Sequence, residues 1–319
     1  MNEVGKRVLV TGGAGFIGSH LCDTLVSGGL EVVAIDNLSN GKIENLSLCN
    51  EKKNFRFIKT DLRQNISDII KNSDTLYHMA AYPEVRTGFD SPELAYEQNV
   101  QNTYNLLESV RQSKISEIVF ASSSVVYGEP KTIPTPETYG PLIPISQYGG
   151  SKLACEGLIS SYCHTYGIRG VIIRLANVIG FRSNHGVIWD FINKLKKNQS
   201  ELEILGDGNQ TKSYIHVSDT IDGILFCSKI SKDRVDVFNI GNDDKIDVRS
   251  IANIVCKNLN LNLKNIQITQ KGGTDDGRGW IGDVKQMQLD ITKIKSWGWN
   301  ARYSSLAAVD LAVKEMLKG

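Results

Sequence analysis

Tyr148 and Lys152 are the residues of this sequence whose types and spacing point most directly to chemistry. They stand at i and i+4 in the segment Ile145–Tyr166, whose pattern predicts a helix, so their side chains share one face. A tyrosine phenol has an ordinary pKa of about 10, and a nearby ammonium group favours the phenolate, which can take a proton from a hydroxyl group. A Tyr-x-x-x-Lys pair is common by chance, however, so the prediction depends on what the rest of the chain brings to it.

Three serines supply further hydroxyl groups. Ser122, Ser123 and Ser124 close the apolar strand that we expect over Ile118–Ala121. A serine hydroxyl at the end of a strand can share a hydrogen bond with the reacting oxygen of a ligand and help to pass its proton. The strand end and the helix face could therefore converge on one bound molecule.

The glycine-rich stretch after the first predicted strand indicates a phosphate-binding loop. Residues 7–11 form an apolar strand that runs into Gly12, Gly15 and Gly18. Gly12 can take the positive φ of a tight turn, Gly15 has no Cβ to block a pyrophosphate, and Gly18 lets the next helix lie close to the strand. The helix expected over Phe16–Ser27 then directs free N–H groups and the positive end of its dipole at the anion.

Asp36 narrows the ligand to a dinucleotide. It ends a second apolar run, residues 31–35, at the separation where an acid can bind both hydroxyls of an adenosine ribose. The same carboxylate would repel a 2′-phosphate, and no arginine follows within residues 37–40, so NAD is favoured over NADP. The alternative is an ordinary glycine-rich turn between a strand and a helix. With NAD present, Tyr148 would remove a proton from a sugar hydroxyl while hydride leaves its carbon.

The elements that must position these residues alternate through the first half of the chain. Strand-like runs and helical patterns follow one another, which predicts an α/β fold with a doubly wound parallel (Rossmann) sheet. The strand-like runs are residues 7–11, 31–35, 55–58, 74–79, 117–122 and 169–175, and a further helix is expected over Pro92–Gln112.

The alternation loosens after about residue 175, which predicts a smaller mixed α/β cap that binds the substrate. The cap would hold a helix over Val187–Lys197 and a strand over Leu202–Leu205. Tyr214–Val217 and Val237–Ile240 are then expected as strands that return to the main sheet, with a helix near Ser218–Ser228 between them.

This pattern divides the chain into two interleaved domains. We expect residues 1–175 and about 214–245 to form the NAD-binding domain. Residues from about 176 to 213 and from 246 to 319 would form the nucleotide-sugar-binding cap.

Composition excludes several classes of partner. With 36 basic and 35 acidic residues the net charge is +1, so no basic surface argues for nucleic acid or an anionic membrane. No apolar run approaches the ~18 residues of a membrane span, and the start of the chain lacks a secretory stretch, so a cytoplasmic protein is expected. Six scattered cysteines and five histidines make no metal-ligand spacing, so we expect reduced structural thiols and no metal.

Several short motifs together resemble extended short-chain dehydrogenases/reductases, in the NAD-dependent sugar epimerase/dehydratase family. Within it the chain is most similar to the UDP-glucose 4-epimerases, especially the compact archaeal-type members, and the resemblance covers nearly all 319 residues. The matching stretches are Thr11–Gly18, Asp36–Asn40, Asp61-Leu62-Arg63, His78–Ala81, Ser122–Gly128, Tyr148–Lys152, Arg174–Asn177 and Gly206–Val217.

The resemblance implies roles for residues that spacing alone does not explain. Ser123, Tyr148 and Lys152 would be catalytic, and Asp61 would bond the adenine amine, with a turn or helix-cap acid as its alternative. His78 is expected to be a buried core histidine. The implied cofactor-binding residues are Gly12, Gly15, Phe16, Ile17, Gly18, Asp36, Asn37, Asn40, Asp61, Leu62, Ala80, Ala81, Asn99, Ser122, Tyr148 and Lys152.

The residues after Ser123 imply the type of reaction. Ser123 lies four residues before Tyr127, where the family places its catalytic Ser or Thr, and 4,6-dehydratases follow it with Asp-Glu. Here those positions hold Ser124 and Val125, and decarboxylating relatives also keep a glutamate in the place of Val125. The resemblance therefore implies epimerisation of a UDP-hexose at carbon 4, through a 4-keto intermediate. An epimerase of UDP-N-acetylglucosamine or UDP-glucuronate, a nucleotide-sugar reductase and an NAD-binding regulator remain alternatives.

Substrate contacts and oligomeric state are implied in the same way. Lys212 stands where many epimerases carry an arginine for the diphosphate, and Arg278 is slightly displaced from the other usual arginine. Two helices, about 92–112 and 146–166, pack as a four-helix bundle in the dimers of relatives, so a homodimer is expected; solvated outer faces are the alternative. The implied substrate-binding residues are Ser123, Ser124, Asn177, Val187, Trp189, Lys212, Arg278 and Met287, the last at the position that gates hexose against N-acetylhexosamine.

Overall fold

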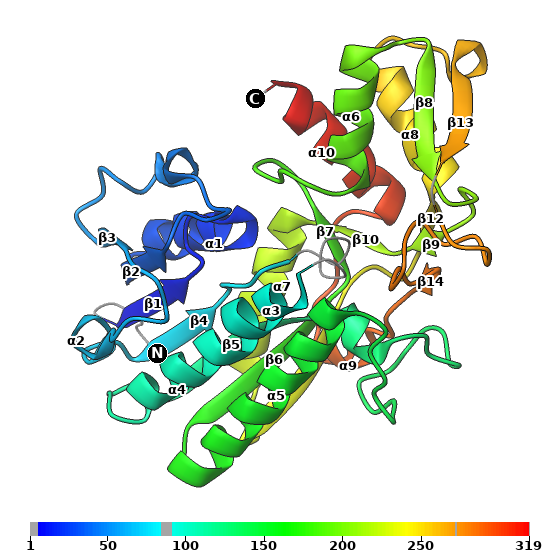
Figure 1. Ribbon diagram of the computed structural model, residues 1–319. Helices are drawn as coiled ribbons and strands as arrows, with labels where there is room; N and C mark the ends of the chain where they lie inside the picture. The colour runs from blue at the N-terminus through cyan, green and yellow to red at the C-terminus, as the bar shows by residue number, and fades with distance from the viewer. Residues whose placement is uncertain (1–5, 84–90, 272, 319) are drawn as a thin grey trace.

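The computed structural model describes residues 6–83, 91–271 and 273–318, and it is built around one parallel sheet (Figure 1). The sheet has the strand order β11-β6-β5-β4-β1-β2-β3, and all of its paired strands are parallel. Its strands are β1 (Arg7–Thr11), β2 (Glu31–Asp36), β3 (Phe55–Lys59), β4 (Thr75–His78), β5 (Glu117–Ser123), β6 (Arg169–Leu175) and β11 (Val235–Ile240). This confirms the expected doubly wound sheet, and the strand order reverses between β1 and β4, where such folds bind ligands.

Helices cover both faces of the sheet because each strand buries alternate residues on opposite sides. Val8 and Val10 of β1 pack with α1 and α7, whereas Leu9 between them packs with α4 and α5. The helices of these two layers are α1 (Phe16–Ser27), α7 (Val217–Ile230) and α9 (Thr292–Ser296) on the first face, and α2 (Ser67–Ile70), α4 (Asn102–Val110) and α5 (Gln147–Tyr166) on the second.

The helix expected over Pro92–Gln112 is continuous, but it is not α-helical throughout. It consists of α3 (Pro92–Ala95), a π-helical turn η3 (Tyr96–Gln101) and α4, which follow one another without a break. A π-turn adds a residue per turn and often lies at a functional site. Here it carries the buried Asn99.

A second hydrophobic core lies beyond the carboxyl edge of the sheet and forms the cap. Its helices are α6 (Val187–Lys197), α8 (Val248–Asn258) and α10 (Ser305–Lys318), and α6 has the bounds expected from the sequence. Its strands are β7 (Asn177–Ile179), β8 (Glu201–Leu205), β9 (Thr211–Lys212), β10 (Tyr214–His216), β12 (Ile246–Asp247), β13 (Gln267–Lys271) and β14 (Gln286–Met287), and it also holds the 3-10 turn η5 (Leu263–Asn265). The 3-10 turns η1 (Ile43–Leu46) and η4 (Ser124–Tyr127) belong to the part of the chain around the main sheet, beside α1 and after β5.

One strand assignment from the sequence is wrong. Tyr214–Val217 was expected in the main sheet, but β10 pairs with β7 in a separate two-stranded sheet. The residues of β10 are divided between two cores. Tyr214 packs in the core of the cap, and Ile215 packs in the main core, which lies between the sheet and helices α1 and α7. The second returning strand is confirmed, because β11 pairs with β6 at the edge of the main sheet.

Candidate active site

The glycine-rich loop after β1 has the shape that a pyrophosphate needs. Gly12 has φ +66°, and a Cβ there would lie 2.7 Å from the backbone of Ala80. A Cβ on Gly18 would lie 2.1 Å from the carbonyl oxygen of Gly12, so only glycine lets the first turn of α1 approach the loop. Gly15 precedes that turn, and no side chain caps it. The N–H groups of the first turn, which starts at Phe16 and Ile17, are therefore available to an anion.

Asp36 lies at the carboxyl end of β2, directly beside this loop. Its carboxylate accepts hydrogen bonds from the backbone N–H of Ala14 (3.0 Å) and of Leu38 (2.8 Å). Burial raises the pKa of the carboxyl group, and the backbone donors act in the opposite direction. The glycine loop and the predicted ribose acceptor are thus joined by a direct hydrogen bond, as the binding of one dinucleotide by both would require.

Asp61 is held by its neighbours. Arg63 donates to both carboxylate oxygens at 3.0 Å, and Asn37 Nδ2 donates to Oδ2 at 3.0 Å. These bonds, led by that of Arg63, lower the pKa of Asp61 to about 2. The Arg63 N–H also donates to Asp61 Oδ1, which is the turn arrangement offered as the alternative to adenine binding. Leu62 is buried and Asn40 is exposed.

The segment after β4 passes close to the glycine loop. The N–H of Ala80 donates to Thr11 Oγ1 at 3.3 Å. Asn99 binds the same segment from the π-turn, because its amide pairs with both the N–H and the carbonyl of Tyr82 and donates to Ser151 Oγ of α5 at 2.8 Å. Asn99 therefore ties the segment containing Ala80 and Ala81 to the helix that carries Tyr148.

His78 is confirmed as a core histidine. Its Nδ1 lies 2.7 Å from Thr11 Oγ1 and its Nε2 lies 3.0 Å from Thr103 Oγ1. Burial, with the charge of Lys152, lowers the pKa of His78 to about 3. The imidazole is therefore neutral at physiological pH.

Helix α5 and the end of β5 bring Ser123, Tyr148 and Lys152 together. Ser146 caps the helix by accepting a hydrogen bond from the N–H of Gly149 at 3.1 Å, so Tyr148 lies in the first turn. Lys152 is only 2% exposed, and its Nζ lies 5.9 Å from the centre of the Tyr148 ring. Its ammonium donates to the carbonyl oxygen of Ala121 at 2.8 Å, which anchors it to β5.

The environment of these groups favours their neutral forms. Burial raises the pKa of Tyr148 to about 12, although a hydrogen bond with Ser123 acts in the opposite direction. Burial lowers the pKa of Lys152 to about 8. The arrangement thus holds a phenol, a hydroxyl and an amine in one enclosed place, where the charge of a bound molecule changes their protonation strongly.

Ser122 belongs to a different group of contacts. Its hydroxyl donates to Glu156 Oε1 at 2.5 Å, and Glu156 forms a buried ion pair with Arg174 at 2.7 Å. Consecutive residues of a strand point to opposite faces, which separates Ser122 from Ser123. Glu156 was not predicted, yet it stands four residues after Lys152, so helical spacing could have identified it. Ser124 is buried at the start of η4.

The substrate-side residues lie on several separate elements. Asn177 begins β7, and its amide donates to the carbonyl of Ser213 at 3.1 Å. Val187 and Trp189 lie in the first turn of α6; Val187 packs on the cap core, whereas Trp189 is 43% exposed. Met287 is only 8% exposed and packs in the main core. This packing does not favour the predicted role of Met287 as a gate that contacts the sugar.

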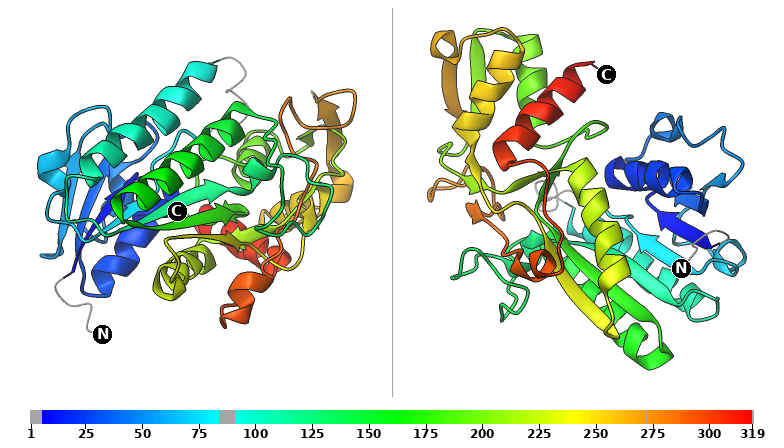
Figure 2. Two further views of the ribbon diagram at one scale, coloured as in Figure 1. Left: turned by 90° about the horizontal axis from the view of Figure 1, so that it is seen from below. Right: turned by 180° about the vertical axis from the view of Figure 1, so that it is seen from behind.

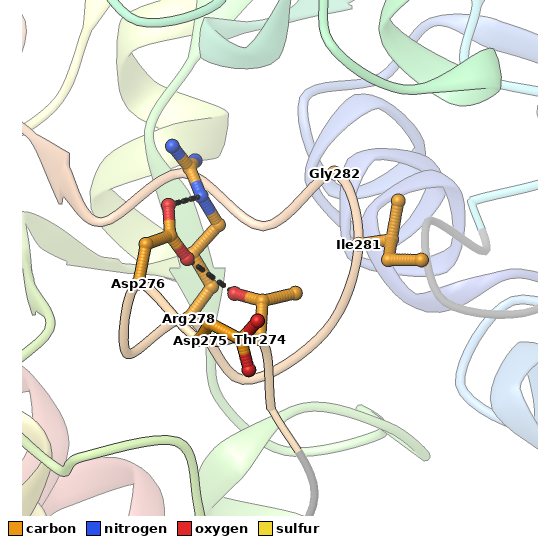
Figure 3. Close-up of a pocket in the computed structure, with 6 residues that line it drawn as sticks. All are labelled: Thr274, Asp275, Asp276, Arg278, Ile281 and Gly282. Carbon is orange, nitrogen blue, oxygen red and sulfur yellow. Dashed lines mark hydrogen bonds and ion pairs between the residues drawn. The ribbon is translucent and has the colours of Figure 1, made fainter.

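Both candidate diphosphate cations are paired with carboxylates. Lys212 Nζ lies 2.6 Å from Asp283 Oδ1. Arg278 donates to Asp276 at 2.7 Å and makes a two-point contact with Glu129. Figure 3 shows Asp276 in contact with both Thr274 and Arg278. These residues line a hollow of about 340 Å³ together with Asp275, Ile281 and Gly282.

Residues 6–83, 91–271 and 273–318 contain no group of three or more His, Cys, Asp or Glu side chains placed to hold a metal ion. Within the same residues, none of the helices combines the length and the apolar character that crossing a membrane requires.

Comparison with known proteins identifies relatives over the whole chain. A protein of Methanocaldococcus jannaschii with the provisional name UDP-glucose 4-epimerase is 36% identical over 297 residues, which make up 92% of each chain. The crystal structure of a UDP-galactose 4-epimerase matches with a TM-score of 0.87 and 40% identity, over 98% of this chain and 99% of that one. The structure of UDP-glucuronic acid 4-epimerase from Bacillus cereus, in complex with UDP-glucuronic acid and NAD, matches with a TM-score of 0.88 and 28% identity, over 98% and 99%.

These matches agree with the residues of the site. The loop after β1 and Asp36 fit NAD, and structures of this kind contain NAD. Residues 8–241 match a family described as the NAD dependent epimerase/dehydratase family. The chain therefore belongs to the NAD dependent epimerase/dehydratase family, and its cofactor is NAD.

Proposed function

We propose that the protein interconverts UDP-glucose and UDP-galactose by epimerisation at carbon 4. The observation that carries this proposal is the cluster of Ser123, Tyr148 and Lys152, which can move a proton to and from a hydroxyl group. Ser124 and Val125 stand where the dehydratases that this chain resembles carry an acid and a base for the loss of water, which favours epimerisation. Relatives named as UDP-glucose and UDP-galactose 4-epimerases support the choice of sugar.

The proposed reaction assigns one task to each residue. Tyr148 takes the proton of the 4-hydroxyl group and later returns it, while Lys152 stabilises the phenolate form. Ser123, which hydrogen-bonds Tyr148, orients the reacting oxygen and helps to pass the proton. When bound, NAD would supply the acceptor and donor of the hydride that carbon 4 loses and regains. Between the two transfers the 4-keto sugar turns, so the hydrogen returns to its other face.

Other residues are proposed to bind rather than to react. We propose that Gly12, Gly15, Gly18 and Asp36 hold NAD. On the substrate side, Asn177, Val187, Trp189, Lys212 and Arg278 are proposed to contact the UDP-sugar. For Lys212 and Arg278 this requires the ligand to compete with Asp283, Glu129 and Asp276.

The two-domain division and the assembly are also proposals. Residues 1–175 with about 214–245 would bind NAD, and the remainder would bind the nucleotide sugar. A homodimer through the helices at about 92–112 and 146–166 is supported by exposed tyrosines on them: Tyr96, Tyr104 and Tyr166. The six cysteines are all buried and unpaired, which supports a place in the reducing cytoplasm.

One experiment tests the reaction and its alternatives together. The purified protein is incubated with UDP-glucose, UDP-galactose, UDP-N-acetylglucosamine and UDP-glucuronate, without added NAD, and the products are identified. Conversion of UDP-glucose into UDP-galactose without net reduction supports the proposal. Conversion only of the N-acetylated or carboxylated sugar would replace it with the corresponding 4-epimerase, and a requirement for added NADH would indicate a reductase.

A further inference from the structure

The loop between β7 and α6 connects the two sides of the proposed site. It follows β7, which begins with Asn177, and leads into Val187 and Trp189 of α6, so it joins residues proposed to contact the substrate. Figure 1 and the right-hand view of Figure 2 show this loop passing close to α1, the helix whose first turn is proposed to face the cofactor. A contact here links the substrate side to the cofactor side.

Arg182 makes the strongest contact of this loop. Its guanidinium lies 2.7 Å from Asp23 Oδ2 and 3.2 Å from Ser19 Oγ, both on α1, and its side chain is only 6% exposed. The backbone of Arg182 has φ +69°, a left-handed conformation that side-chain-bearing residues adopt at a cost. The fold thus places an arginine, and not a glycine, in a strained turn whose side chain reaches α1.

Further bonds fix the loop from both sides. His20 Nε2 on α1 donates to the carbonyl of Phe181 at 3.0 Å, and the N–H of Phe181 donates to Glu315 of α10 at 3.2 Å. Glu315 also accepts from His216 Nε2 at 3.0 Å. The loop is therefore held between the cofactor helix and the C-terminal helix of the cap.

We propose that Arg182 is a positioning residue that sets the distance between the cofactor helix and the substrate-binding strand by means of Asp23. The proposal rests on the proposed function, because only hydride exchange between two bound molecules requires their separation to be fixed. A misplacement of about 1 Å between reacting groups can cost on the order of 10²-fold in rate. Asp23 is the acceptor through which Arg182 acts, and Ser19 is next to Gly18, so the contact reaches the turn that receives the pyrophosphate.

The test compares R182Q, R182K, D23N and the double variant R182Q/D23N. Glutamine keeps the unbranched start of the side chain and a polar end while removing the charge and the reach of the guanidinium. We expect R182Q and D23N each to lower kcat at least about tenfold with little change in KM. The double variant should lose no more than one of the single variants, and R182K should recover part of the rate.

The matched control is R169Q. Arg169 forms an ion pair with Glu117 at 2.8 Å, at the amino ends of β5 and β6 and thus at the opposite edge of the sheet. R169Q should lower the melting temperature while leaving kcat unchanged. Equal loss of kcat in R169Q and R182Q, or additive losses in the double variant, would overturn the proposal.

A readout independent of turnover separates this proposal from the reaction itself. NAD affinity of the stripped protein and amide hydrogen exchange in residues 16–27 are measured for the same variants. R182Q and D23N should weaken NAD binding severalfold and speed exchange in the first turn of α1, and R169Q should do neither. If the wild type converts no UDP-sugar, the proposed function fails, and these two measurements still decide the role of Arg182; unchanged values in R182Q would refute it.

Discussion

Replacing Tyr148 by phenylalanine removes one hydroxyl group from an otherwise intact site. Burial raises the pKa of Tyr148 to about 12, against an ordinary value of about 10. This difference corresponds to about 3 kcal/mol in favour of the neutral phenol. At pH 7 only on the order of one molecule in 10⁵ would carry the phenolate. The positive charge of a bound nicotinamide and of Lys152 must supply the opposing free energy.

Tyr148→Phe should therefore lower kcat by about 10²–10⁴-fold, the usual range for loss of a general base. Lys152→Ala should lose at least as much, because it removes the neighbouring charge. Ser123→Ala should lower kcat less than these variants if another hydroxyl group can relay the proton. That group would be Ser124 or a water molecule, because the hydroxyl of Ser122 donates to Glu156.

The assay measures the epimerisation rate, the retained NAD content and the melting temperature of each variant. Tyr139→Phe is the matched control, because that hydroxyl accepts a hydrogen bond from the backbone N–H of the exposed Lys131 and has no role in the proposed sites. If Tyr148→Phe turns over every accepted UDP-sugar within about threefold of the wild type, a margin far below the effect of losing a base, Tyr148 is not the base.

Four further outcomes follow from particular residues. Asp36→Ala should relax the preference for NAD over NADP, and equal affinity of the wild type for both in titration would refute the ribose assignment. Burial holds the pKa of His78 at about 3 in the folded protein, below its unfolded value of about 6.5. The neutral imidazole therefore contributes its full stabilisation above pH 6.5, and this contribution is lost as the pH falls toward 3. In His78→Gln the melting temperature should depend less on pH between about 6.5 and 3 than in the wild type. Glu156→Gln should destabilise the protein by about 3–5 kcal/mol, because it leaves Arg174 buried without its partner, and urea unfolding measures this. Light scattering should give twice the mass of the 35.2 kDa chain, and a monomer at micromolar concentration would contradict the dimer.

The main sheet and the phosphate-binding loop could be predicted because their signals are local. Continuous apolar runs predict strands such as β1 and β5, and only glycine satisfies the backbone at Gly12. The pairing of β10 could not be predicted, since a three-residue apolar strand fits the edge of any nearby sheet. Periodicity shows that a strand exists and not which neighbour it finds.

The site was predictable to the extent that its residues share an element. Tyr148 and Lys152 follow from helical spacing, and Glu156 extends the same spacing by one more turn. The partners of Lys212 and Arg278 could not be foreseen, because Asp283 and Glu129 reach them through tertiary contacts. The contact of Arg182 with Asp23 likewise joins residues 159 positions apart.

The carboxylates beside Lys212 and Arg278 change how an anion would be selected. A lysine or arginine without a partner would attract chloride and inorganic phosphate as well as a nucleotide. When the side chain is already paired with a carboxylate, a ligand must displace that carboxylate, and the free energy gained is only the difference between the two ion pairs. Asp283 at 2.6 Å from Lys212 makes that difference small for a simple ion. A ligand that exchanges with these carboxylates must therefore bring binding energy from other parts of its structure, and small anions of the surrounding solution compete for the same positions only weakly.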